Sequence, residues 1–207
     1  MKDALSVLKQ SAPVMPVAAF KSMDHAAACA DLFAEAGVPA VEVTLRHPDA
    51  WQMIKLFKER MPGASIGVGT VVNRRQMLRA MDEADFVISP GFSSELSAMA
   101  RKTLTTYIPG IATATELMAA MAEEHSVFKL FPASAIGGVK LLKALAGPFP
   151  DAVFCPTGGI SVEDYQDYLA LDCVHCVGGS WIVPSEQALK EERAAYLTML
   201  QSLYAKP

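Results

Sequence analysis

Short apolar runs recur along the chain at intervals of 20 to 26 residues, and amphipathic stretches separate them. Each interval has room for a strand, a loop and a helix of about three turns. The segment 25–37 places Ala, Leu and Phe at helical spacing before a glycine suited to a C-cap, and Thr113 with Glu116 has the pattern of a capping box. The eight predicted strands begin near Val14, Ala40, Ser65, Phe86, Thr106, Val127, Ala152 and Val174.

Apolar strands that alternate with helices indicate a parallel sheet covered by helices. Eight such units close a (β/α)8 barrel, and 207 residues lie near the lower end of the size range of that fold. An open doubly wound sheet would normally carry a glycine-rich nucleotide turn, and the nearest candidate, at 67–72, lacks the third glycine. We therefore predict an α/β protein with the (β/α)8 TIM barrel fold, as a single domain over 1–207. Flanking helices are expected within 3–10 and 185–205.

Composition narrows the possible partners. Hydrophobic residues make up 52% of the chain, which excludes a disordered or fibrous protein. The net charge of −4, without a Lys/Arg cluster, argues against a nucleic-acid partner. No apolar stretch is long enough to span a bilayer. Four cysteines in apolar surroundings suit a reducing compartment, so we expect a cytoplasmic protein with no membrane partner.

Charged residues interrupt the second predicted strand. Strand residues alternate between the two faces of a sheet, so Glu42, Thr44 and Arg46 share the face that points into the barrel. Buried charges are unfavourable unless they are paired. Two interpretations stay open: an internal structural ion pair, or catalytic groups that lead toward the C-terminal mouth, where barrel enzymes keep their chemistry.

The sixth predicted strand carries a lysine, Lys129, between Val127 and Phe131 on one face. Burial of an ammonium group costs several kcal/mol. Desolvation and a nearby cation such as Arg46 would favour the neutral amine, which is the form that attacks a ketone. The alternative is a lysine that extends to solvent at the end of the strand. Convergence of a lysine, a carboxylate and an arginine on one barrel mouth favours Schiff-base chemistry.

Glycine pairs follow the last two predicted strands, at Gly158 and Gly159 and at Gly178 and Gly179. Backbone amides in such loops can approach an anion closely, because glycine adds no side chain. The loops after strands seven and eight are where many barrels bind phosphate. One pair alone is more often a tight turn, but two pairs at these strands indicate a phosphate site.

The motifs occur in one order along the chain: EVTLR at 42–46, GVGT at 67–70, SPG at 89–91, IPG at 108–110, KLFPA at 129–133, PTGGI at 156–160 and GGSW at 178–181. This ordered set closely resembles the 2-keto-3-deoxy-6-phosphogluconate (KDPG) aldolases, which include the bifunctional 4-hydroxy-2-oxoglutarate (KHG) aldolases. The resemblance extends from about Val14 to Pro184.

The resemblance implies a (β/α)8 barrel, usually a homotrimer, that acts as a class I aldolase without a metal or other cofactor. It assigns the Schiff-base lysine to Lys129 and the general acid/base to Glu42. Its small-molecule partner would be a phosphorylated keto acid. The implied substrate-binding residues are Arg46, Thr70, Pro90, Phe131 and Thr157, and the implied phosphate-binding residues are Gly158, Gly159, Gly179 and Ser180.

One departure leaves the choice of substrate open. Many members of the family carry Glu directly after Phe-Pro-Ala of the lysine strand, whereas this chain has Ser134. KDPG, its galactonate-derived epimer and KHG share one pyruvyl end. A phosphate-binding barrel with different chemistry and a non-catalytic metabolite-binding barrel remain alternatives. The spacing of Cys173 and Cys176 suggests zinc or redox chemistry, but without a second such pair we interpret it as structural.

Overall fold

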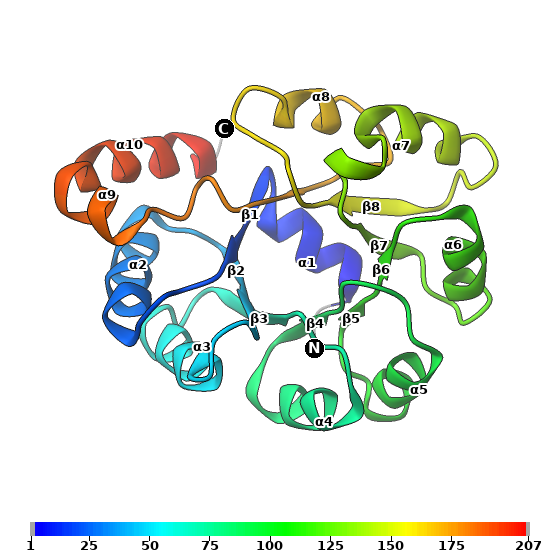
Figure 1. The fold of residues 1–207 in the computed structure, drawn as a ribbon, viewed down its shortest axis with the longest axis horizontal. Helices are drawn as coiled ribbons and strands as arrows, with labels where there is room; N and C mark the ends of the chain where they lie inside the picture. Colours follow the sequence, from blue (N-terminus) through cyan, green and yellow to red (C-terminus); the bar gives the residue numbers. More distant parts are fainter. Residues whose placement is uncertain (1–2, 206–207) are drawn as a thin grey trace.

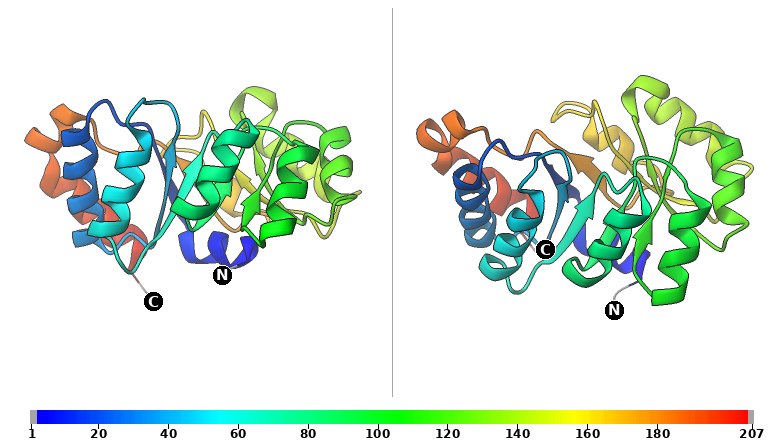
Figure 2. Two further views of the ribbon diagram at one scale, coloured as in Figure 1. Left: turned by 90° about the horizontal axis from the view of Figure 1, so that it is seen from below. Right: turned by 60° about the horizontal axis from the view of Figure 1, so that its bottom comes forward.

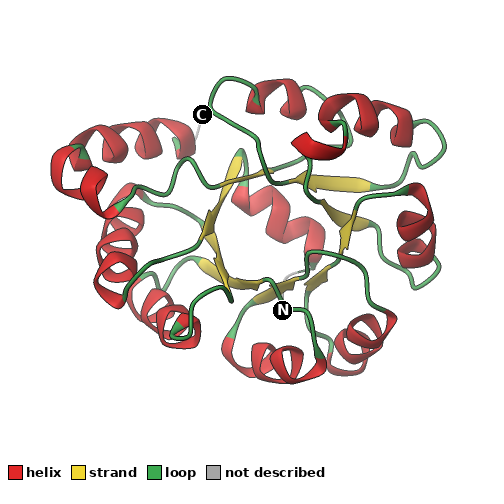
Figure 3. Cartoon of the chain, in the orientation of Figure 1, coloured by secondary structure: helices red, strands yellow, loops and turns green. Residues whose placement is uncertain are grey.

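A computed structural model describes residues 3–205 and shows short parallel strands in a ring, with helices around the outside (Figures 1 and 3). The strands are β1 (Val14–Ala18), β2 (Ala40–Thr44), β3 (Ser65–Gly69), β4 (Phe86–Ile88), β5 (Tyr107–Ile108), β6 (Gly110–Ile111), β7 (Val127–Leu130), β8 (Val153–Pro156) and β9 (Val177–Gly179). The helices are α1 (Ala4–Ser11), α2 (Met23–Ala36), α3 (Ala50–Arg60), α4 (Arg74–Glu83), α5 (Ser94–Thr103), α6 (Ala114–Met121), α7 (Gly138–Ala146), α8 (Tyr165–Leu169), α9 (Glu186–Glu191) and α10 (Arg193–Tyr204), with a short 3-10 helix, η1 (Ser134–Ile136).

The order of elements is that of a (β/α)8 barrel, but the hydrogen-bonded ladder is interrupted twice. One sheet has the order β5-β4-β3-β2-β1-β9, and the other has the order β6-β7-β8. The fifth predicted strand is split because Pro109 has no N–H to donate to a neighbouring strand, although its carbonyl still accepts the N–H of Lys129 at 2.9 Å.

The second interruption lies between β8 and β9. The sequence predicts a strand from about Val174, but the regular strand begins only at Val177. Two isolated bridges, from Phe154 to Val174 and from Thr157 to Gly178, connect the sheets there. The predicted start was therefore wrong by three residues, because Val174 makes a single bridge outside the regular strand.

Local signals in the sequence explain several helix ends. The capping box of α6 is present: the Thr113 hydroxyl accepts the N–H of Glu116 at 3.3 Å, and the Glu116 carboxylate accepts the N–H of Thr113 at 3.0 Å. Helix α2 ends at Gly37, which has a positive φ of 72°. Both predictions are confirmed.

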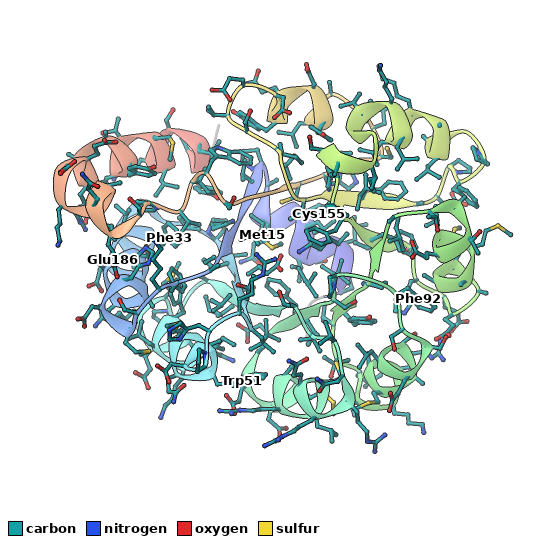
Figure 4. All side chains as sticks on the ribbon, in the orientation of Figure 1. Met15, Phe33, Trp51, Phe92, Cys155 and Glu186 are labelled. Atoms are coloured by element: carbon teal, nitrogen blue, oxygen red, sulfur yellow. The ribbon has the colours of Figure 1, made fainter. Side chains whose placement is uncertain are left out.

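Helix α1 closes the N-terminal end of the ring, as Figure 2 shows from the side. Val7 and Leu8 of this helix are buried in one cluster with Met15 and Cys155 of the strands. Figure 4 places Met15 and Cys155 near the middle of the ring, over α1. Because this end is filled by apolar side chains, the C-terminal ends of the strands are left as the place for chemistry.

The outward faces of the strands form the main core. Val41 and Val43 of β2 are buried in one cluster with Phe33 of α2 and Phe57 of α3, as the alternation in β2 predicts. Among residues 3–205, no helix is both long and apolar enough to cross a membrane.

Candidate active site

Lys129 and Glu42 meet inside the ring although 87 residues separate them in sequence. The Lys129 Nζ donates to Glu42 Oε1 at 3.0 Å and to Oε2 at 3.2 Å. The two side chains are only 5% and 2% exposed. A lysine that extends to solvent is therefore the wrong interpretation. The pair gives an amine nucleophile and a carboxylate base in direct contact, away from bulk water.

The partner of Lys129 differs from the one that the sequence suggests. The sequence suggests Arg46 as a cation near the lysine; the ion pair of Lys129 in the structure is with the carboxylate of Glu42. Arg46 lies two residues beyond the end of β2, and its side chain is exposed. No ion pair between Arg46 and another residue of the described chain is found. An Arg46–Glu42 ion pair is thus excluded as the reason for these charges.

A glycine in β3 makes room for the Glu42 carboxylate. Strands β2 and β3 are parallel neighbours, with Thr44 opposite Gly69. A Cβ on Gly69 would collide with Oε1 of Glu42 and would lie 2.7 Å from its Cγ and Cδ atoms. The glycine therefore sets the position of the base.

Gly69→Ala is expected to displace Glu42 and to lower kcat, for the aldol cleavage that the sequence resemblance implies, by about 100-fold. Overpacking should also reduce the free energy of unfolding by about 1–3 kcal/mol. Steady-state kinetics and urea unfolding measure the two effects. Gly63→Ala is the matched control, because nothing lies within 4 Å of a Cβ at Gly63. Wild-type kcat in Gly69→Ala would contradict this account.

The turn that contains Pro90 packs close to the lysine strand. A Cβ on Gly110 would collide with the carbonyl of Pro90, and Gly110 is the register partner of Lys129 in the β6–β7 ladder. The Ser89 hydroxyl donates to Gly91 O at 2.7 Å and forms a 2.6 Å hydrogen bond with Tyr107 Oη.

Tyr107 supplies the proton in that hydrogen bond, because the Ser89 hydrogen is already used. Burial raises the pKa of Tyr107 to about 12, so its hydroxyl keeps the proton at neutral pH. The chain from Tyr107 through Ser89 fixes the turn beside Lys129.

Thr70, directly after β3, has a φ of 65°. A β-branched residue is strained in this left-handed region, at a cost of about 1–3 kcal/mol. Such strain is concentrated at functional sites. Thr70 follows the glycine that contacts Glu42, so the strained residue lies next to the buried pair.

A cleft of about 290 Å³ lies at the C-terminal ends of the strands, and neither Lys129 nor Glu42 is among its lining residues. Phe131 connects the cleft to the buried Lys129–Glu42 pair, because its side chain lines the cleft and its ring centroid lies 5.4 Å from the Lys129 Nζ. Of the predicted site residues, the cleft brings together Arg46, Phe131, Thr157, Gly158, Gly159 and Ser180.

Gly158 and Gly159 have positive φ values of 98° and 74°, which only glycine adopts readily. The side chain of Ser134 borders this turn, since a Cβ on Gly159 would lie 2.8 Å from the Cβ of Ser134. The residue that departs from the family pattern, Ser134, therefore lies at the glycine turn.

Gly179 does not line the cleft. It is paired with Pro16 in the β1–β9 ladder, and a Cβ there would point to the Trp181 ring, with Cη2 at 2.7 Å. The preceding residue, Gly178, lines the cleft instead, because successive strand residues face opposite sides. Thr70 and Pro90 also lie outside the lining; Thr70 follows Gly69, and Pro90 packs against Gly110, the register partner of Lys129.

The cysteine pair singled out in the sequence shows no ligand geometry. Cys173 and Cys176 are both free thiols, and burial raises the pKa of each. Within residues 3–205, no cluster of three or more His, Cys, Asp or Glu side chains is arranged to hold a metal ion.

A comparison with known protein families identifies the family of this chain. The family model for KDPG and KHG aldolase matches residues 5–199. The chain belongs to the KDPG and KHG aldolase family. Aldolases of this family are lyases that act on carbon–carbon bonds.

Individual aldolases of this family are similar over almost the whole chain. The KHG/KDPG aldolase of Escherichia coli is 44% identical over 186 residues, which cover 89% of this chain and 87% of that protein. The 2-dehydro-3-deoxy-phosphogluconate aldolase of Zymomonas mobilis is 38% identical over 95% of this chain and 97% of its own. A crystal structure of KDPG aldolase from Legionella pneumophila, with pyruvate captured as a covalent carbinolamine, has a TM-score of 0.90 and 40% identity and covers 98% of both chains.

Three polar cleft residues of this KDPG and KHG aldolase family member escaped the motif analysis. They are Lys21 in the β1–α2 loop, His25 in the first turn of α2, and Ser185 in the segment between β9 and α9. The rule that barrel sites form at the C-terminal ends of strands points to both loops. Neither loop has a distinctive motif at these positions, so the sequence signal for Lys21 and His25 is weak.

Proposed function

We propose that this chain is a class I aldolase that cleaves KDPG to pyruvate and glyceraldehyde 3-phosphate, and that it also cleaves KHG to pyruvate and glyoxylate. The observation that carries the proposal is the buried contact of Lys129 Nζ with Glu42, at 3.0 and 3.2 Å. An amine and a carboxylate in contact form the minimal apparatus for imine chemistry.

In the first stage, the ammonium of Lys129 transfers a proton to Glu42 and leaves a neutral amine. The amine attacks the C2 ketone to give a carbinolamine. The protonated Glu42 then returns its proton to the carbinolamine hydroxyl, which leaves as water and gives a protonated imine, with Glu42 again a carboxylate. This cation withdraws electrons from the adjacent carbons and prepares the C3–C4 bond for cleavage.

In the second stage, Glu42 as carboxylate removes the proton of the C4 hydroxyl, either directly or through a water molecule. The C3–C4 bond breaks, its electron pair enters the enamine, and the aldehyde product leaves. Protonation of the enamine at C3 and hydrolysis of the imine release pyruvate and restore Lys129.

We assign the two ends of the substrate to two parts of the site. Arg46, Thr70, Pro90, Phe131 and Thr157 bind and orient the keto acid, which raises the rate by positioning. Gly158, Gly159 and Ser180, which line the cleft, bind the phosphate; Gly179, the fourth residue that the resemblance implies, lies outside the lining. The glycine turn with positive φ values supports this assignment, since amides of such turns can converge on an anion.

The test of this proposal is a comparison of kcat/KM for KDPG, its galactonate-derived epimer and KHG, with pyruvate release as the readout. We expect KDPG to have the highest value, at least about 10-fold above KHG, because only the phosphorylated substrates can use the glycine turn. A clear preference for KHG would contradict the phosphate assignment. A preference for the epimer would make the chain a 2-keto-3-deoxy-6-phosphogalactonate aldolase.

We further propose that the protein is a single-domain, cytoplasmic homotrimer. The trimer rests on the family resemblance. Four free cysteines among the described residues support a reducing compartment.

A further inference from the structure

The cleft at the C-terminal ends of the strands has an uneven charge distribution. Two cationic side chains line it, Lys21 and Arg46, and none of its lining residues is Asp or Glu. Within the described chain, no ion pair neutralises either cation, and both residues are exposed. A cleft with two free positive charges favours a ligand that carries several negative charges.

Lys21 belongs to a loop that three hydrogen bonds hold in place. The buried His25 is 6% exposed, its Nε2 lies 2.8 Å from Pro184 O, and its Nδ1 accepts the N–H of Lys21 at 3.4 Å. The hydroxyl of Ser22 donates to Glu186 Oε1 at 2.8 Å. These contacts connect the β1–α2 loop to the segment that follows Ser180.

The hydrogen bonds of His25 define its protonation state. Its Nε2 must donate, because a carbonyl can only accept, and its Nδ1 must accept from the backbone N–H of Lys21. The ring is therefore the neutral tautomer with the proton on Nε2. It acts as a connector between two loops and adds no positive charge to the cleft.

We infer that Lys21 is a specificity-determining residue that pairs with the phosphate of the substrate, and that His25 is the positioning residue that holds the Lys21 backbone for this contact. The inference rests on the proposed function and deepens it. Arg46 is assigned to the keto acid, and the glycine amides and Ser180 are neutral donors. Lys21 is then the one charged side chain of the cleft that is left for the phosphate dianion.

Substrate length gives this contact its selectivity. The carbon chain of KHG ends at C5 in a carboxylate with a single charge, whereas KDPG carries its phosphate on the oxygen of C6. A cation that recognises the phosphate therefore contributes to binding of KDPG and contributes little to binding of KHG.

The test measures kcat/KM of Lys21→Gln for both substrates. We expect an approximately 10-fold loss with KDPG, mainly through KM, and a change of less than about 2-fold with KHG. Lys21→Arg should recover most of the loss. Lys55→Gln is the matched control for net charge, because Lys55 is an exposed residue of α3 that does not line the cleft, and it should resemble the wild type.

His25 is tested by a double-mutant cycle with KM for KDPG as the readout. His25→Ala should raise this KM in the wild-type background, and it should add little in the Lys21→Gln background if both residues act on one contact. Full additivity would mean that His25 supports the fold generally, and would overturn its positioning role. Thermal unfolding of each variant checks that the proteins are folded at the assay temperature.

The outcomes separate this inference from the proposed function. Equal losses with KDPG and KHG, or no loss with either, would overturn the role of Lys21 while leaving the aldolase intact. No cleavage of KDPG by the wild-type protein would overturn both proposals.

Discussion

Lys129→Ala is expected to abolish aldol cleavage, with a fall in kcat on the order of 10⁴-fold or more, because the imine cannot form without the amine. The direct readout is treatment with pyruvate and borohydride, followed by mass spectrometry of the peptides. The wild-type protein should carry a reduced adduct on the peptide that contains Lys129, and Lys129→Ala should carry none.

The structure also predicts a stability change in this variant. Removal of Lys129 leaves the Glu42 carboxylate, only 2% exposed, without its partner. Loss of one member of a buried pair costs about 3–5 kcal/mol. Lys129→Met keeps more of the side-chain volume and serves as a second variant, and circular dichroism establishes that both are folded.

An exposed lysine provides the control for trapping. Lys143 lies on α7 with an exposed side chain, and Lys143→Ala should form as much adduct as the wild type. An adduct on a lysine other than Lys129 would refute its assignment as the nucleophile. No adduct in folded wild-type protein would favour the metabolite-binding barrel without catalysis.

Glu42→Gln is expected to lower kcat by about 10²–10⁴-fold, the usual contribution of a general acid/base. Glutamine keeps an oxygen that accepts from Lys129 but cannot take up a proton from the C4 hydroxyl. The adduct with pyruvate should therefore still form at long times, at a reduced rate. Trapping separates this variant from Lys129→Ala, in which neither cleavage nor trapping occurs.

A carboxylate on the outer surface provides the comparison for Glu42. Glu59 is exposed on α3, and Glu59→Gln should have wild-type kinetics. If Glu42→Gln retained wild-type kcat, the base would have to be another group. If it formed no adduct even at long times, the role of Glu42 would be confined to imine formation or to holding Lys129.

Much of the fold and of the site could be predicted from the sequence because local patterns carry the information. Five of the predicted strand starts, among them Ala40 and Val127, coincide with the observed ones. Alternation within single strands placed Glu42 and Lys129 on inward faces, and both side chains are buried in the ring. The capping box of α6 depends only on residues three positions apart, so it too could be predicted from the sequence.

The tertiary structure alone decided which groups meet. Alternation specifies a face of a strand but not the residue opposite it, so the partner of Glu42 proved to be Lys129 instead of Arg46. The register of β9 against β1 turned Gly179 away from the cleft.

The sequence by itself thus determined the strand–helix repeat, the inward position of the catalytic pair and the family, because each depends on local spacing or on motif order. Which residues line the cleft depends on loops that are distant in sequence and close in the folded chain, as the hydrogen bond between His25 and Pro184, 159 residues apart, shows. Such contacts depend on the path of the whole chain, and no local pattern encodes the distance between two loops.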